Sequence, residues 1–134
     1  MTVLEALPVF NQPTADDVAY VLTTAVAVLE TNGWLQGNLY DAAEAETGTP
    51  RSACRVCAVG ALNVASAGTP VLGLSESERD LPKAVILADM ARAALGEHIG
   101  PEGVTVWNDA PGRTVEQVID VMRTAAANLL EGRR

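Results

Sequence analysis

Apolar residues that recur every three or four positions constrain this chain more than any other feature of its sequence. Near the C-terminus one stripe holds Val115, Val118, Ile119, Met122, Ala125, Ala126 and Leu129. Such a stripe covers one face of an α-helix, which must be buried against other elements. Residues 14–32, 52–66 and 82–96 repeat the spacing. The pattern predicts an all-α fold, a compact bundle of four to five helices with irregular connections.

The composition fits such a bundle in a single domain. The chain has 134 residues, of which 49% are hydrophobic but only 4% aromatic. A length of this order is typical of one domain, and a core of Ala, Val and Leu favours closely packed helices. We therefore expect residues 1–134 to form one helical domain. Residues 1–13, interrupted by Pro8 and Pro13, are expected to form an irregular arm that packs onto it.

Residues with known capping preferences mark the predicted helix ends. Thr14 and Ser52 are expected N-caps, and Thr114 with Gln117 forms a capping-box pattern. Asn32-Gly33 and Gly68 are expected stops. Gly60 lies inside a predicted helix, where glycine is unfavourable. We expect another element to approach closely there.

The remaining segments carry weaker signals. A short helix is expected around residues 39–46, and a helical turn at 76–80, with Asp80 capping the helix that starts at Pro82. Residues 104–107 alternate and are β-branched, which predicts one short extended segment. No other segment offers a strong strand partner for it.

The charge balance disfavours several classes of partner. The net charge is −8, and residues 1–50 contain no Lys or Arg. Phosphate backbones and anionic membranes attract basic patches, so nucleic-acid and membrane binding are disfavoured. No signal peptide or membrane span is recognisable. Two cysteines without an export signal indicate a reducing compartment, and we expect a cytoplasmic protein.

Cys54-x-x-Cys57 is the most noticeable spacing of reactive side chains. With Cys54 in the first turn of a helix, between Arg51 and Arg55, its pKa would be lowered, as in a redox couple or a thiol-dependent enzyme. Such motifs normally follow a strand, which is not expected here. Both cysteines also fall on the apolar face, where free Cys packs as a small hydrophobe. We favour core packing over a reactive pair or half of a zinc site.

Other catalytic and metal-binding patterns are weaker still. A zinc site would need His98 and Asp109 as further ligands, and nothing in the spacing requires this. No serine lies in a G-x-S-x-G motif, and the glycines match no phosphate-binding loop. We therefore predict no metal and no cofactor, and the chain is expected to be non-enzymatic.

The richest polar loop is Trp107-Asn108-Asp109, followed by Arg113. Together with Trp34, these side chains could line a pocket for a small ligand or a partner. The alternative, which we favour, is that both Trp residues fill the core while Asn108 and Asp109 bond to nearby backbone and hold the turn.

Several motifs occur together in order along the chain: Trp34-x-x-Gly37, Cys57-x-x-Gly60-Ala61, Trp107-Asn108-Asp109 and a last helix capped by Thr114. In this combination the chain resembles DUF6197, a family of short uncharacterised proteins of actinobacteria and phages, over roughly residues 18–130. Cys57 matches the family pattern, whereas Cys54 is an addition, which argues further against a redox or zinc pair. The resemblance implies a phage or actinobacterial setting and no particular activity.

The leading hypothesis is a small acidic cytoplasmic accessory protein that binds another protein. The alternatives are a thiol-dependent enzyme or redox sensor using Cys54 and Cys57, and a small-ligand-binding domain around the Trp107 loop.

Overall fold

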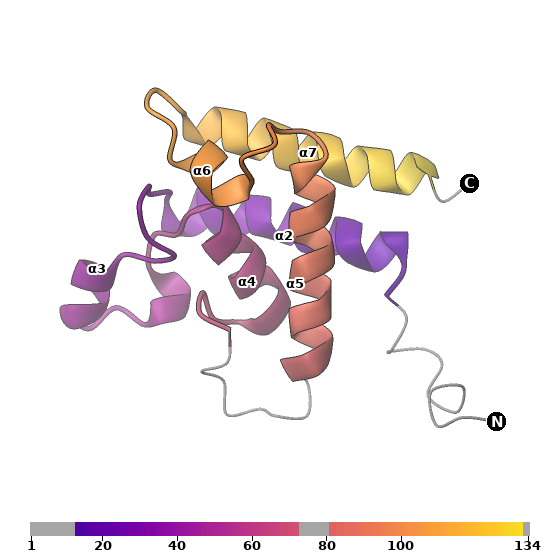
Figure 1. Cartoon of the computed structure of the whole chain (residues 1–134). Coiled ribbons are helices and arrows are strands. Elements are labelled where there is room, and N and C mark those ends of the chain that lie inside the picture. Colours follow the sequence, from indigo (N-terminus) through magenta and orange to yellow (C-terminus); the bar gives the residue numbers. More distant parts are fainter. Residues whose placement is uncertain (1–12, 73–80, 133–134) are drawn as a thin grey trace.

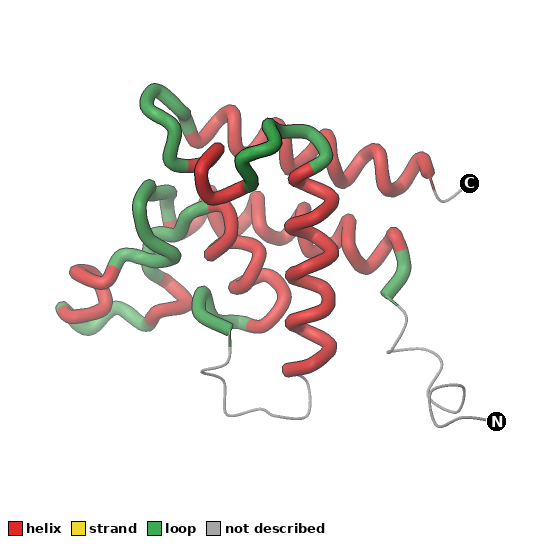
Figure 2. The backbone as a smooth tube through the Cα atoms, in the orientation of Figure 1, coloured by secondary structure: helices red, strands yellow, loops and turns green. Residues whose placement is uncertain are grey.

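The chain folds into helices joined by irregular loops (Figure 1; Figure 2). The computed structural model describes residues 13–72 and 81–132, and these contain no β-sheet. The longer helices are α2 (Ala15–Asn32), α4 (Ala58–Ala67), α5 (Leu81–Gly96) and α7 (Val115–Gly132). Short helices are α3 (Ala42–Glu46) and α6 (Val104–Asn108), and Arg51–Ala53 forms a 3-10 turn, η1. The all-α prediction is confirmed.

Two expectations fall on parts of the chain that are not described. These are the packing of the N-terminal arm, which concerns residues 1–12, and the turn at 76–80 with its capping Asp80. Among the helices that are described, none combines the length and the apolar character that crossing a membrane requires.

Helix α2 lies at the centre of the packing and contacts α7, α4 and α5. α2 and α7 run side by side, and α5 crosses them at a steep angle (Figure 1). The four largest fully buried side chains come one from each long helix: Leu22, Leu62, Leu95 and Met122. Alanines such as Ala25, Ala61 and Ala91 are completely buried between them. Small side chains allow the helices to approach closely, as the composition predicts.

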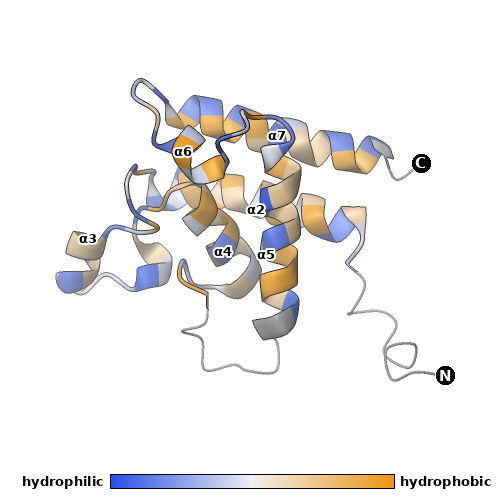
Figure 3. Ribbon diagram, viewed as in Figure 1, coloured by the Kyte–Doolittle hydropathy of each residue, from blue (hydrophilic) through white to orange (hydrophobic). Residues whose placement is uncertain are grey.

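Figure 3 shows how the apolar stripe of α7 is used. Hydrophobic residues lie along the side that faces α2, and hydrophilic residues lie along the opposite side. Val118, Met122, Ala125 and Ala126 are the buried residues of this helix. The periodicity of residues 115–129 thus identified the buried face.

Most of the predicted helix ends are confirmed. The hydroxyl of Thr14 accepts a hydrogen bond from the Asp17 N–H, and the Asp17 carboxylate accepts one from the Thr14 N–H, completing a capping box. Thr114 and Gln117 form the same arrangement ahead of α7. Gly33 and Gly68 end their helices with positive φ angles of 98° and 80°. These ends show features that can be recognised in the local sequence.

The predicted start of the 52–66 helix is wrong. Arg51–Ala53 forms η1, and α4 begins only at Ala58, with Cys57 rather than Ser52 as its N-cap. Between them Val56 is extended, and isolated β-bridges join it to Trp34 on one side and Tyr40 on the other. Cys54 therefore lies outside any α-helix and receives no benefit from a helix dipole.

Gly60 shows the close approach that its position predicts. The carbonyl oxygen of Leu39 accepts a hydrogen bond from the Cys57 N–H, over 3.3 Å, and lies directly against Gly60. A Cβ on Gly60 would overlap this oxygen and would lie 3.1 Å from the Val56 Cβ. The absence of a side chain here lets the 37–41 segment pass across the start of α4.

The expected extended segment at 104–107 is also wrong, because Val104–Asn108 forms α6. The alternation of Val104 and Val106 would place both on one face of a strand. Instead Val104 and Trp107 are buried, at 3% and 8% exposed, whereas Val106 is 56% exposed. Burial three residues apart fits a helical turn, and contact with α4 and α5 decides the conformation.

Candidate binding site

Asn108 is the centre of a polar cluster that joins three distant parts of the chain. Its side chain is fully buried, and its Oδ1 accepts hydrogen bonds from the Trp34 indole Nε1, at 2.7 Å, and the Ala58 N–H, at 2.9 Å. Its Nδ2 donates to the Leu35 carbonyl and to Asp109 Oδ1. An amide side chain has two donor hydrogens and two acceptor lone pairs, and all four are used. We call these five residues the Asn108 cluster.

Asn108 also completes the start of α4. The first N–H groups of a helix have no partner within the helix. Here Asn108 Oδ1 accepts from the Ala58 N–H, and the Cys57 thiol sulfur accepts from the Gly60 N–H at 3.4 Å. Because one of these two capping groups comes from a residue 50 positions away, the sequence near Cys57 did not show where the helix begins.

Gln36 and Asp109 extend the same contact between loops. Gln36 Nε2 donates to the carbonyl oxygens of Asn108 and Ala110, each at 3.0 Å. Asp109 Oδ1 accepts from the Gly37 N–H at 2.9 Å. Gln36 was not among the predicted site residues, because nothing in its local sequence indicates a partner more than 70 positions away.

Arg113 packs back onto Trp107. Its guanidinium lies over the Trp107 ring, 4.1 Å from the centroid, and its Nε donates to the Trp107 carbonyl at 2.9 Å. The predicted tight turn is present, since the Arg113 N–H bonds to the Ala110 carbonyl and Gly112 has a φ of 83°. The cation of Arg113 is thus held against the protein.

The structure therefore brings together all five residues that the sequence suggested for a pocket. The polar groups of Trp34, Asn108 and Arg113 form hydrogen bonds within the protein, and the Trp107 ring is buried. Asp109 also lines a cavity.

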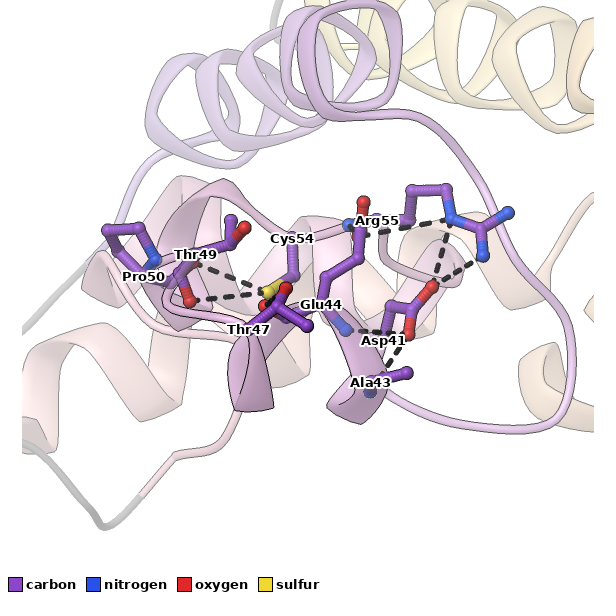
Figure 4. A network of polar contacts seen from close by, with 8 residues as sticks. All are labelled: Asp41, Ala43, Glu44, Thr47, Thr49, Pro50, Cys54 and Arg55. Atoms are coloured by element: carbon purple, nitrogen blue, oxygen red, sulfur yellow. Dashed lines mark hydrogen bonds and ion pairs between the residues drawn. The ribbon is translucent and has the colours of Figure 1, made fainter.

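Cys54 and Cys57 are free, buried thiols in different surroundings. Cys54 donates to the Thr49 and Pro50 carbonyls in the loop before η1 (Figure 4), whereas Cys57 caps α4. The prediction that both lie inside the protein is confirmed, but the expected lowering of the Cys54 pKa is wrong. Burial, together with the nearby Glu44 and Asp41 carboxylates, raises the pKa of Cys54. Burial also raises the pKa of Cys57.

Both thiols should consequently react slowly in the native protein. At pH 8 we expect alkylation by iodoacetamide to be much slower than for a free cysteine, because a raised pKa leaves less thiolate and burial blocks the reagent. Cys57, at 5% exposed, should react before Cys54, at 0%. Mass spectrometry of time points with and without denaturant measures this. Native rates equal to those in denaturant would contradict the burial of the thiols.

Asp41, Glu44 and Arg55 form a polar network beside Cys54 (Figure 4). Asp41 Oδ1 caps α3 by accepting from the Ala43 and Glu44 N–H groups, and Oδ2 pairs with the Arg55 guanidinium. The Arg55 N–H donates to Glu44 Oε1 at 2.8 Å. The network fixes α3 and the 37–41 segment against the extended Val56 region. The pKa of Asp41 is lowered, mainly because its carboxylate accepts a hydrogen bond from the Arg55 guanidinium.

Asp41 should make stability depend on acid pH. A lowered folded pKa gives a contribution that is present above the ordinary Asp pKa of about 4 and lost as pH falls through the folded pKa. Asp41→Asn keeps the cap but removes the negative charge that pairs with Arg55, so we expect a lower melting temperature at pH 7. The difference from wild type should shrink towards pH 2. Asp120→Asn, on an exposed part of α7, controls for the loss of one negative charge. An undiminished difference at pH 2 would contradict the assignment.

A hollow of about 530 Å³ lies beside the Asn108 cluster. It is lined by Gly37, Asn38, Leu39, Tyr40, Ala42, Cys57, Val71, Thr105 and Asp109. We call it the Asp109 hollow. Within the described part of the chain its only charged lining residue is Asp109, and Leu39, Tyr40 and Val71 give it apolar walls. The volume lies in the range of about 300–1,000 Å³ that is usual for ligand sites.

His98, the single histidine of the sequence, does not line the Asp109 hollow. His98 lines a separate hollow of about 300 Å³ with Glu97 and Asn128, and its Nε2 lies 3.3 Å from Asn128 Nδ2. It shares no lining residue with the Asp109 hollow. Over residues 13–72 and 81–132, His, Cys, Asp and Glu side chains form no group of three that could hold a metal ion.

A family model described as a family of unknown function (DUF6197) matches residues 13–128. The likeness expected from the Trp34, Cys57 and Trp107 motifs is thereby confirmed. The matched region includes the whole Asn108 cluster and every residue that lines the Asp109 hollow. No curated protein and no solved structure matches the chain.

Proposed function

The chain belongs to the DUF6197 family, whose function is unknown, and we propose that it is a non-enzymatic accessory protein that binds another protein through the Asp109 hollow. One observation carries the proposal. A concave, mainly apolar surface with a single fixed carboxylate, that of Asp109, lies beside the buried side chain of Asn108, whose polar atoms are all paired within the protein. A partner could fit an apolar group into such a surface and place a positive charge against its carboxylate.

The chemistry of the lining supports binding over catalysis. The Cys57 thiol has a raised pKa and its sulfur accepts the Gly60 N–H, which does not favour a nucleophile. His98, the single histidine of the sequence, lies in another hollow and cannot serve as its base. These placements also weaken the alternative of a thiol-dependent enzyme or redox sensor.

A protein partner agrees with the surface properties of the chain. A net charge of −8 repels nucleic acids and anionic membranes, and it attracts basic protein surfaces. Tyr40, which is half-buried at the hollow, is of a residue type enriched in protein interfaces. A small organic ligand is the second candidate, favoured by the volume of the hollow alone.

We place this role in the cytoplasm of an actinobacterial cell or of a cell infected by a phage. Support for the compartment comes from two cysteines that remain unpaired, as is usual under reducing conditions. Support for the setting comes from the resemblance that the Trp34, Cys57 and Trp107 motifs carry.

The proposal can be tested with a matched pair of substitutions. Thr105 is exposed on α6 and lines the hollow, and Thr124 is exposed on α7 away from it. Thr105→Arg adds bulk and positive charge at the hollow, while Thr124→Arg adds the same group elsewhere. In native pull-downs from the host, we expect a discrete protein to be retained by wild type and Thr124→Arg and lost with Thr105→Arg. Equal retention by all three, or no retained protein at all, would refute binding through the hollow.

A further inference from the structure

We infer that the Asp109 hollow recognises an alkylammonium group, the chemistry of a lysine side chain, with Asp109 as its counter-charge. The inference rests on the proposed function and names the group that the partner presents. It follows from how the carboxylate is held, from the charges around it and from the walls of the hollow.

The Asp109 carboxylate is held in one orientation. Its Oδ1 accepts from the Gly37 N–H and from Asn108 Nδ2, both at 2.9 Å. Its Oδ2 has no partner within the described part of the chain. Asn108 is itself fixed by its bonds to Trp34, Leu35 and Ala58, so the carboxylate is preorganised. Binding then costs little ordering of the protein.

No basic side chain of the described residues neutralises this carboxylate. Arg113 lies on the Trp107 ring, and Arg55 is paired with Asp41 and Glu44. Arg51 lies over the Tyr40 ring, 5.9 Å from its centroid, but does not line the hollow. Arg92 lines an adjoining hollow together with Asp89, and it neither lines the Asp109 hollow nor forms an ion pair with Asp109. A phosphate or carboxylate ligand would therefore meet the negative charge of Asp109, whereas a cation would find its counter-ion in place.

The free oxygen and the walls favour an ammonium over a guanidinium. A guanidinium pairs best with both oxygens of a carboxylate, but Oδ1 already accepts two hydrogen bonds. An ammonium is a point charge that one oxygen can accept. Leu39 and Val71 supply apolar surface for the methylene stem, and the exposed Thr105 contributes a hydroxyl.

The test is a titration of the full ¹⁵N-labelled chain with n-butylammonium chloride at constant ionic strength. We expect saturable shifts of the Gly37, Thr105 and Asp109 amides. The same titration with n-butanol should give no such shifts. Asp109→Asn should weaken n-butylammonium binding by about tenfold or more, since it removes a charged partner. Asp120→Asn should not, and melting curves of both variants establish that they are folded.

Parallel titrations with a tripeptide containing lysine and one containing norleucine distinguish a side-chain source from a free amine. Stronger binding of the lysine peptide than of n-butylammonium would identify a protein segment as the source, and the reverse would identify a small amine. Equal shifts with n-butylammonium and n-butanol, or an unchanged affinity in Asp109→Asn, would overturn charge recognition. If those results came while Thr105→Arg still lost its protein partner, the proposed function would stand and this inference alone would fail. If the chain bound the amine but Thr105→Arg had no effect on a protein partner, charge recognition in the hollow would stand and the proposed protein binding through it would fail.

Discussion

Replacing Asn108 by Leu is expected to destabilise the protein by about 3–5 kcal/mol. The substitution has a similar size but leaves the Trp34 indole N–H, the Ala58 N–H and the Leu35 carbonyl without their buried partner. Each unsatisfied buried group costs about 1–3 kcal/mol, and neighbouring losses are not additive. Urea unfolding followed by circular dichroism measures the change as a shift of the midpoint at constant slope.

Two companion substitutions separate the hydrogen bonds of Asn108 from general effects. Asn128→Leu, at an exposed position of α7, should change stability by no more than about 0.5 kcal/mol. Asn108→Asp keeps an acceptor for Trp34 and Ala58 but sets a carboxylate against Asp109 Oδ1. Burial and like charge should raise the pKa of the new carboxyl group, so this variant should gain stability relative to wild type as the pH falls. A loss below about 1 kcal/mol for Asn108→Leu would mean that the cluster is unimportant for stability.

Gly60→Ala is expected to cost about 3 kcal/mol or more, although alanine is the better helix former. The added Cβ would overlap the Leu39 carbonyl oxygen, which cannot move without losing its hydrogen bond from Cys57. It would also crowd the Val56 side chain. Thermal unfolding of the purified variant, with circular dichroism as the probe, measures the loss.

Gly96→Ala is the matched control for Gly60→Ala. Gly96 is also helical, but a Cβ there would meet nothing within 4 Å. We expect this variant to be neutral or stabilised by up to about 1 kcal/mol. Equal effects of the two substitutions would show that close approach of Leu39 is not what requires glycine at position 60.

Much of the fold could be predicted from the sequence because it depends on local or periodic features. The stripe from Val115 to Leu129 identified α7 and its buried face, and the capping residues Thr14 and Thr114 identified two helix starts. These features act within one or two helical turns. Their consequences therefore appear in any short window of the sequence.

The features that escaped prediction depend on contacts between distant residues. Residues 104–107 alternate like a strand, but burial of Val104 and Trp107 makes them helical. The expected lowering of the Cys54 pKa assumed that a helix begins at Ser52. The helix begins at Ala58, where Asn108 accepts the first N–H, and Cys54 lies buried outside it with a raised pKa. No local pattern could reveal a cap supplied from 50 residues away.

The candidate site divides in the same way. The sequence identified Trp34, Trp107, Asn108, Asp109 and Arg113 as a set, and the structure places them together. The sequence did not indicate that the other four residues would contact each other and the backbone. Nor did it indicate that Asp109 would be the member of the set whose charge faces the hollow. Leu39, Tyr40 and Thr105, which also line it, carry no recognisable motif.

Hydrogen exchange of the two indole N–H groups, followed by ¹⁵N-resolved NMR, tests most directly whether Asn108 joins these segments. Trp34 Nε1 donates to the buried Asn108 Oδ1, so its signal should persist in D₂O on the timescale of global unfolding. Trp107 has an equally recognisable indole signal but no bond to Asn108, and should exchange much sooner. In Asn108→Leu the two rates should converge. A Trp34 signal that disappears as fast as that of Trp107 in the wild-type protein would contradict the account.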